Sequence, residues 1–242
     1  SRMATAEIVI PMARAIYPNY AKLKDNLKEL TESFLIVLRT VSIVSFSFGF
    51  GIAAVSEDIV YVILGDQWGF AVPLVSWLGV FGTFAAIQST VSGHILIVLN
   101  RERTVFVITW ARLLVFAASV LTAAMLGNVV DIAMATALST AAFTVGCLFY
   151  LPKVLPVPIT RLLLEIFRVF LTALLMFAAV RTLHSQTISS HLTTLAIDVV
   201  TGASVFTVIL GLSWIAAGRP DGPEKRVIKL ISDRLGRRFG RP

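Results

Sequence analysis

Six apolar stretches, each long enough to cross a bilayer, constrain the fold of this 242-residue chain more than any other feature. A helix needs about 20 mostly apolar residues to span the hydrocarbon core of a membrane. Only 14% of the residues are charged, whereas a soluble domain carries about 25%. The chain therefore lacks the polar side chains to cover a water-soluble fold of this size. The sequence predicts an all-α membrane protein, a polytopic bundle of six transmembrane helices at residues 34–55, 71–99, 104–126, 129–151, 161–183 and 192–217.

The second stretch is the longest of the six. Its length allows a strongly tilted helix, a broken helix or an interfacial start at Pro73. Glycine and proline inside a membrane helix are tolerated where neighbouring helices satisfy the freed backbone groups. We therefore keep residues 71–99 as a single membrane crossing.

The connections between the stretches alternate in charge. Residues 56–70, 127–128 and 185–190 contain no Lys or Arg, whereas Arg101, Arg103 and Lys153 lie in the other two connections. Because Lys and Arg are enriched in cytoplasmic loops, this pattern places the basic connections and both ends of the chain in the cytoplasm. The net charge of +7 follows from this topology, and since no nucleic-acid-binding motif accompanies it, no nucleic-acid partner is expected.

The C-terminal tail, residues 218–242, is strongly basic. Apolar residues recur in it at helical intervals, at Val227, Ile228, Ile231 and Leu235. This pattern predicts a basic amphipathic helix on the anionic inner leaflet. The alternative is a solvated tail whose charge only fixes the topology.

Three short motifs resemble a known family. The segment Pro11–Pro18 with the polar residues after it is similar to the central cytoplasmic segment of polysaccharide transporter proteins. Leu64 and Gly65 followed by Trp68, and then Ala71 and Pro73, resemble a recurring stretch of the same proteins. The turn Asn100–Arg101 is also similar. These proteins are oligosaccharide flippases of the multidrug/oligosaccharidyl-lipid/polysaccharide exporter superfamily, and the resemblance covers about residues 1–105.

The resemblance implies a domain organisation. Residues 1–33 would be the end of a truncated preceding span plus a cytoplasmic connection, residues 34–217 the six-helix transmembrane lobe, and residues 218–242 the cytoplasmic tail. The six helices would form one lobe, the C-terminal half, of a two-lobed transporter in the bacterial inner membrane. The missing N-terminal half of the same chain would supply the other lobe.

The resemblance also implies a function. The protein would move a lipid-linked oligosaccharide, carried on a polyprenyl pyrophosphate, from the inner to the outer leaflet for lipopolysaccharide or exopolysaccharide biosynthesis. Its partners would be that substrate and membrane lipid, with no cofactor. Two alternatives are a membrane glycan polymerase or ligase and a multidrug or ion antiporter of the same superfamily. Outer connections of at most about 15 residues are short for a catalytic loop, and an interior bias toward Arg disfavours a cationic drug.

The residue patterns add no enzyme motif and no metal site. The chain contains no nucleotide-binding loop, no nucleophile elbow and no zinc-protease signature. Its three histidines and its one cysteine, Cys147, lack metal-ligand spacing. We therefore expect a protein that is not an enzyme, with no catalytic residue and no metal.

Charged residues inside the predicted spans are the candidate site residues, because charge is costly in hydrocarbon and often functional. Arg112, on a face with Thr109 and Ser119, lies about 12 Å inside its helix end and is the first candidate contact for the substrate pyrophosphate. Arg39 and Arg168 are further candidates, although each lies near enough to a helix end to snorkel to the interface. Glu165 would then pair with Arg161 or Arg168.

Asp198 is the candidate residue for ion coupling. It lies one to two turns inside the last span, on a face with Thr194 and Thr201. Intramembrane carboxylates bind a coupling proton or cation in transporters. The alternative is a structural ion pair with Arg181 across the outer connection.

Overall fold

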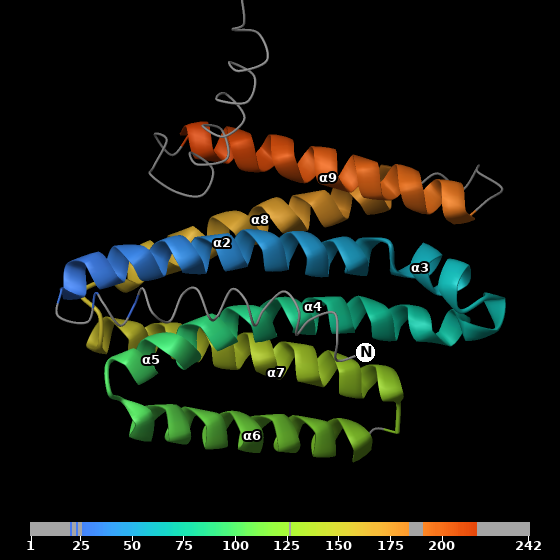
Figure 1. Cartoon of the computed structure of the whole chain (residues 1–242). Helices are drawn as coiled ribbons and strands as arrows, with labels where there is room; N and C mark the ends of the chain where they lie inside the picture. The colour runs from blue at the N-terminus through green and yellow to red at the C-terminus, as the bar shows by residue number, and fades with distance from the viewer. Residues whose placement is uncertain (1–19, 21–22, 24–25, 126, 184–190, 217–242) are drawn as a thin grey trace, which may run out of the picture. The chain divides into compact units, whose positions relative to one another are not determined.

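The computed structural model describes residues 20, 23, 26–125, 127–183 and 191–216 of the chain, and the predicted preceding span and basic tail lie outside these residues. The described part is helical and contains no β-strand (Figure 1). Its helices are α2 Leu27–Ala54, α3 Ser56–Ile63, α4 Val72–Ser89, α5 Ile95–Val98, α6 Glu102–Met125, α7 Val129–Tyr150, α8 Ile159–Leu183 and α9 His191–Ala216.

Six helical segments in this part are long and apolar enough to cross a membrane: Leu27–Ala54, Asp66–Val98, Glu102–Met125, Val129–Lys153, Ile159–Leu183 and His191–Ser213. The prediction of an all-α polytopic membrane protein with six spans is thus confirmed. The largest boundary error is the start of the first span, because α2 begins at Leu27 instead of near residue 34. Its first turns are polar, and hydropathy alone does not detect a helix that continues beyond its apolar part.

The second span is broken, as its length allowed. A 3-10 helix, Asp66–Ala71, precedes α4, whose first turn contains Pro73 where the missing N–H costs nothing. A π-helical turn, Thr90–His94, then separates α4 from α5. A π-helical turn lengthens the backbone hydrogen-bond spacing of the helix by one residue, and such turns are frequent at functional sites.

The predicted outer connection after the first span is folded. Ser56–Ile63 forms α3, with Glu57 and Asp58 in its first turn, where carboxylates are favoured by the helix dipole. Gly65 then turns the chain with φ of 88°, a conformation that side chains other than glycine rarely adopt. The connection is therefore a folded, largely helical segment.

The chain divides into two compact units. One unit, which we call the α8–α9 unit, consists of Arg39–Thr83 and Leu164–Pro242. In it α2 and α4 cross at Gly49 and Gly79, so closely that a Cβ on Gly49 would lie 2.5 Å from the carbonyl oxygen of Gly79. The rings of Phe46, Phe50 and Phe170 pack α2 against α8, with centroids 5.7–5.8 Å apart.

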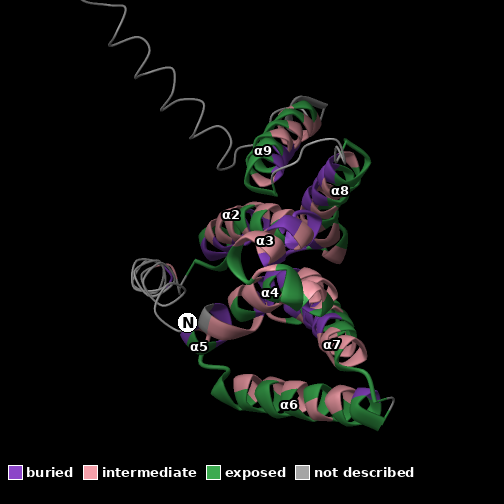
Figure 2. Cartoon of the chain, turned by 90° about the vertical axis from the view of Figure 1, so that its right-hand side faces the viewer, coloured by how far each residue is buried: buried purple, intermediate pink, exposed green. Residues whose placement is uncertain are grey.

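The other unit, the α6–α7 unit, consists of Ser1–Leu38 and Phe84–Leu163. Its α6 and α7 form an antiparallel pair joined by a tight turn at Gly127, and Asn128 caps α7 by accepting a hydrogen bond from the Val130 N–H. Hydroxyl contacts cross the pair at Ser119–Ser139, 3.1 Å, and at Thr104–Tyr150, 3.4 Å. Helix α6 itself is mostly exposed or half-buried, with Ala123 its one buried residue (Figure 2).

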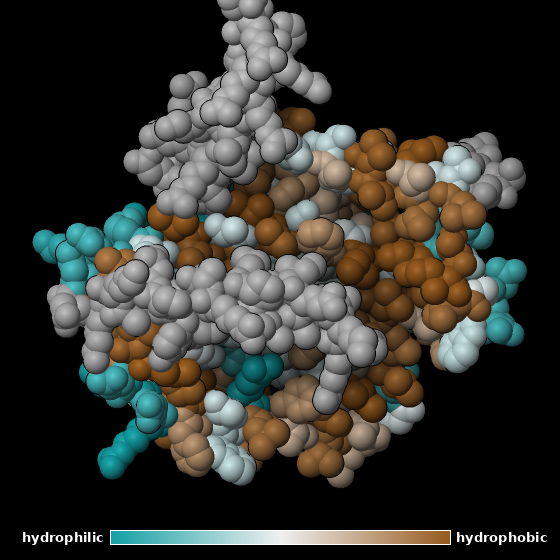
Figure 3. All heavy atoms as spheres, viewed as in Figure 1, coloured by the Kyte–Doolittle hydropathy of each residue, from teal (hydrophilic) through white to brown (hydrophobic). Residues whose placement is uncertain are grey.

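The exposed surface of the helices is apolar, as a membrane-facing surface must be. In the face shown by Figure 3, hydrophobic residues cover most of the helical surface, and hydrophilic residues gather toward helix ends. Large apolar side chains that are more than half exposed include Phe48, Phe106, Leu114, Phe149 and Leu164. In water such a surface would drive aggregation, whereas lipid tails cover it without cost.

Candidate functional site

Arg39 is buried and paired, which the sequence did not predict. Its guanidinium donates two hydrogen bonds to the carboxylate of Glu165, from Nε at 2.6 Å and from Nη2 at 2.5 Å. The whole residue is 5% exposed, and the Glu165 side chain is 18% exposed. A side chain held in this fork is tied to α8, which supports a structural role for Arg39. The pair joins α2 to α8, two helices that are 126 residues apart at this point.

The residues that follow Arg39 on the same face of α2 are packed. Ser42 is fully buried, and its hydroxyl has no hydrogen-bond partner among the described residues. The Ser45 carbonyl accepts a hydrogen bond from the Thr83 hydroxyl, 3.1 Å, and Gly49 forms the crossing with α4. This line of small and polar residues therefore serves close helix packing within the α8–α9 unit.

Arg161 forms a different pair from the one predicted. Its guanidinium donates to both carboxylate oxygens of Glu32, at 2.9 and 3.1 Å. Both side chains are about half exposed. The expectation that Glu165 pairs with Arg161 is therefore wrong. Arg168, the remaining candidate on α8, is half-buried, and its backbone carbonyl accepts a hydrogen bond from Thr172.

Arg112 lies on α6, a helix that buries almost nothing. The residue is half-buried, and no hydrogen bond or ion pair to it occurs within the part of the chain that the structure describes. Arg112 thus differs from Arg39 in lacking a described carboxylate that neutralises it.

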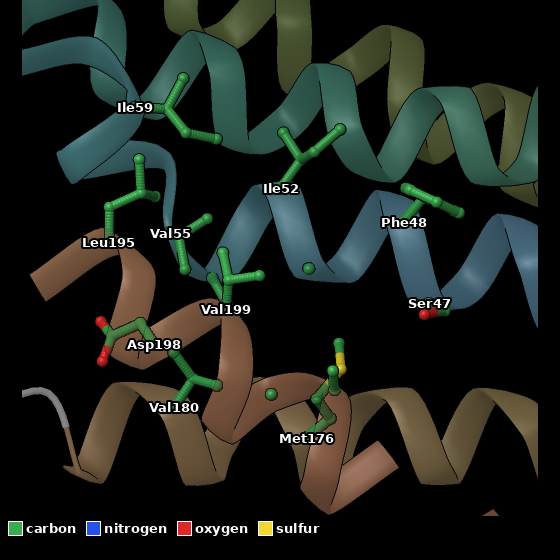
Figure 4. A pocket seen from close by; sticks show the side chains of 14 residues that line it. Ser47, Phe48, Ile52, Val55, Ile59, Met176, Val180, Leu195, Asp198 and Val199 are labelled. Atoms are coloured by element: carbon green, nitrogen blue, oxygen red, sulfur yellow. The ribbon is translucent and has the colours of Figure 1, made fainter. Parts of the chain in front are cut away.

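Asp198 is 4% exposed and lies on α9 with the buried Thr194. It lines a groove of about 460 Å³ in the α8–α9 unit, which we call the α9 groove. The other lining side chains are almost all apolar, and Figure 4 shows Asp198 beside Val180 and Leu195. Arg181, the predicted structural partner of Asp198, lies instead 3.8 Å from the carboxylate of Glu57.

One side-chain hydrogen bond between distant residues was missed by the sequence analysis altogether. Asp58, on α3, is 2% exposed, and its Oδ1 lies 3.0 Å from Nδ1 of His191 at the start of α9. The Tyr61 ring stacks on the same imidazole, with centroids 4.9 Å apart. The available signal was the acidic first turn at Ser56–Asp58 followed by an apolar run, which is typical of a helix. These contacts tie α3 to α9, and no group of three potential metal ligands occurs within the described residues.

Comparisons with known proteins agree with the resemblance seen in the sequence. A family model described as polysaccharide biosynthesis protein matches residues 1–73. The teichuronic acid biosynthesis protein TuaB of Bacillus subtilis is 26% identical over 136 residues, which are 56% of this chain and 28% of that protein. The lipopolysaccharide biosynthesis protein WzxC of Escherichia coli is 26% identical over 80 residues, 33% of this chain and 16% of that protein.

The fold also has a counterpart among solved structures. The lipid II flippase MurJ, in an inward closed conformation, aligns with a TM-score of 0.67 and 14% identity, over 83% of this chain and 42% of that one. At this identity the likeness shows the fold. The chain spans less than half the length of each of these proteins. The sequence matches show similarity to bacterial proteins named for polysaccharide biosynthesis, and with six apolar helices they support a multi-pass bacterial membrane protein.

Proposed function

We propose that this chain is one lobe of a transporter that moves a lipid-linked oligosaccharide across the bacterial inner membrane for polysaccharide or lipopolysaccharide biosynthesis. The family matches support the class of protein, since relatives of this chain are named for polysaccharide biosynthesis and its structural neighbour is named a flippase. They favour a transporter that performs no covalent chemistry. The polyprenyl-pyrophosphate carrier, the second lobe and the direction of transport are parts of the same proposal.

The observation that carries the proposal is the contrast between two intramembrane arginines. Arg39 is neutralised by Glu165, and we assign it to structure. Arg112 has no acid partner within the described residues, and an uncompensated cation in hydrocarbon is costly unless it meets water or an anion. A pyrophosphate that crosses the bilayer needs such a cation to replace its lost hydration. Arg112 is therefore the first substrate contact, and the half-buried Arg168 is the second.

The test of this assignment is export of surface polysaccharide by cells whose full-length protein carries Arg112→Ala. The variant should insert and accumulate normally, because the apolar helices and basic connections fix the topology, but export should fall at least tenfold. Arg112→Lys should retain part of the export, since a point charge remains while the bidentate fork is lost. The control is Arg161→Ala, which removes an exposed arginine. Normal export by a stably expressed Arg112→Ala protein would refute the assignment.

Asp198 is the proposed coupling residue. It is a buried carboxylate that lines an apolar groove within a membrane span, and intramembrane carboxylates bind coupling ions in transporters. In vesicles that contain the full-length protein, Asp198→Asn should abolish the dependence of transport on an imposed proton or sodium gradient. Unchanged dependence in this variant would leave Asp198 with a packing role.

The proposed orientation places the connection at Asn100–Arg103 in the cytoplasm and α3 outside. In a Cys147→Ser background, single cysteines at Gln67 and Glu102 report the two sides. A membrane-impermeant thiol reagent added outside should label position 67 and spare position 102, because Glu102 lies between Arg101 and Arg103. The reverse labelling would invert the topology of the lobe.

A further inference from the structure

A second groove lies between α6 and α7, in the α6–α7 unit, and the proposed function does not use it. It encloses about 530 Å³ and is lined by Thr104, Val107, Ile108, Ala111, Val115, Ser139, Ala142, Phe143, Gly146, Cys147 and Tyr150. This volume falls within the range of about 300–1,000 Å³ that is usual for ligand clefts. The lining is dominated by small and apolar side chains, with hydroxyls at the two contact points between the helices. We call it the α6–α7 groove.

The end of this groove at the start of α6 is basic. Arg101 and Arg103 flank the first residue of α6, and Lys153 follows α7; all three are exposed. The hydroxyls of Thr104 and Tyr150 lie 3.4 Å apart, which brings the start of α6 to the end of α7. The Lys153 ammonium lies 6.0 Å from the centre of the Tyr150 ring. Glu102 is the acidic residue among these positions, so the rim carries three basic residues and one acidic residue.

The aromatic residues near the rim complete an arrangement suited to a membrane interface. The rings of Phe106 and Trp110 lie on α6 with centroids 6.0 Å apart, and both side chains are more than half exposed. Tyr150 closes the rim from α7. Tyr and Trp are enriched at the level of lipid headgroups. We place the rim at headgroup depth because Tyr150 lies there beside exposed basic residues, and the apolar groove extends from it toward the hydrocarbon.

The geometry points to the α6–α7 groove as a binding site for an anionic phospholipid of the cytoplasmic leaflet. The negatively charged phosphodiester lies against Arg101, Arg103 and Lys153, and one acyl chain lies along Val107, Ala111 and Phe143. Charge complementarity selects this occupant, because a zwitterionic lipid offsets its phosphate with its own ammonium. The cytoplasmic leaflet is also the one toward which basic connections are oriented.

The site is distinct from the proposed substrate contact. Arg112 lies 11 residues beyond Arg101 along the chain, or about 16 Å along a helix. A lipid bound at the rim holds α6 to α7 from the membrane side without occupying Arg112. Loss of this lipid therefore changes the stability of the α6–α7 pair and leaves recognition of the pyrophosphate intact.

The test uses the full-length protein in nanodiscs of phosphatidylcholine that contain about 20% phosphatidylglycerol as the anionic lipid. Native mass spectrometry then counts the phosphatidylglycerol molecules that the protein retains. Arg103→Ala combined with Lys153→Ala should weaken retention roughly 30-fold, the effect of two interfacial charges. The charge-matched control, Lys28→Ala with Arg161→Ala, removes two exposed bases outside the groove and should leave retention unchanged.

A third variant distinguishes lipid binding in the groove from attraction to surface charge. Gly146→Leu adds a side chain where a Cβ meets nothing within 4 Å, so the fold should tolerate it while the groove is filled. Retention should fall here too, with all bases present. Equal loss in both charge variants, or full retention in Gly146→Leu, would reduce the effect to unspecific surface attraction and overturn the site. Displacement of phosphatidylglycerol by a polyprenyl pyrophosphate at equal concentration would also overturn it, because the groove would then belong to the substrate.

Discussion

Helices α2 and α6 are both long and apolar, and each has an arginine within its apolar stretch, yet they stand at opposite extremes of packing. In the most apolar window of α2, 39% of the residues are buried, compared with 0% in α6. Arg39 in α2 is 5% exposed and forms two hydrogen bonds to Glu165. Arg112 in α6 is half-buried, with no acid partner in the described part of the chain. The residue type is the same, but in α2 its charge is neutralised by a carboxylate and in α6 no described carboxylate neutralises it.

The comparison teaches that the position of a charge along a membrane helix does not decide its role. With α2 beginning at Leu27, Arg39 lies 12 residues inside its helix, about as far as Arg112 lies inside α6. What differs is whether a second helix supplies a carboxylate. A paired arginine fixes one helix against another, whereas an arginine without such a partner remains available to an anion.

The largest expected effect is on stability, from Arg39→Ala. Removal of one partner leaves the Glu165 carboxylate uncompensated in a mostly buried position, which costs about 3–5 kcal/mol of folding free energy. Thermal unfolding of the purified protein in detergent should show a large fall in Tm. Arg39→Met combined with Glu165→Leu should restore most of it, since a packed apolar pair carries no desolvation cost.

The matched control for Arg39→Ala is Arg161→Ala. The Arg161–Glu32 pair has similar bidentate geometry but is half exposed, and exposed pairs contribute about 0–1 kcal/mol. Its Tm should change little. If both alanine variants lose the same stability, burial does not distinguish the two pairs, and the contrast between α2 and α6 fails with it.

An intermediate effect is expected at the α2–α4 crossing, from Gly49→Ala. The added Cβ would lie 1.8 Å from the Thr83 hydroxyl oxygen and 2.5 Å from the Gly79 carbonyl oxygen, so the helices must separate, at a cost of about 1–3 kcal/mol. Gly51→Ala is the control, because a Cβ there meets nothing within 4 Å. Equal Tm values for the two variants would show that α2 and α4 are not in close contact at this point.

The smallest expected effect comes from Ser42→Ala, one turn after Arg39. The Ser42 side chain is fully buried, and its hydroxyl has no partner among the described residues. Its removal should leave stability within about 1 kcal/mol or raise it slightly, since a buried hydroxyl without a partner carries a desolvation penalty. Polysaccharide export should be unchanged. A clear loss of export with normal Tm would show that this face of α2 meets substrate after all.

The charge pairs mark the limit of what sequence reasoning reached. Periodicity placed Arg39, Arg112, Arg168 and Asp198 inside apolar spans, and alternation of basic connections gave a consistent topology. It could not give partners, because Glu165 is 126 residues from Arg39 and Asp58 is 133 residues from His191. Sequence reasoning expected Glu165 to pair with an arginine of its own helix, because helical spacing reveals only neighbours on the same helix.

By itself, the sequence determined that this chain is a bundle of six apolar helices. The length and hydropathy of each stretch are local properties, and they decide whether a helix can span the hydrocarbon core of a bilayer. The three motifs within residues 1–105 also pointed, from sequence alone, to polysaccharide transporter proteins, and the sequence comparisons match proteins named for polysaccharide biosynthesis. Only the tertiary structure decided which arginine is neutralised, which carboxylate lines a groove, and that residues 56–63 form a helix tied to α9. Each of these depends on the approach of segments far apart in the chain, and the free energy of a buried charge is set by those neighbours and not by its own helix.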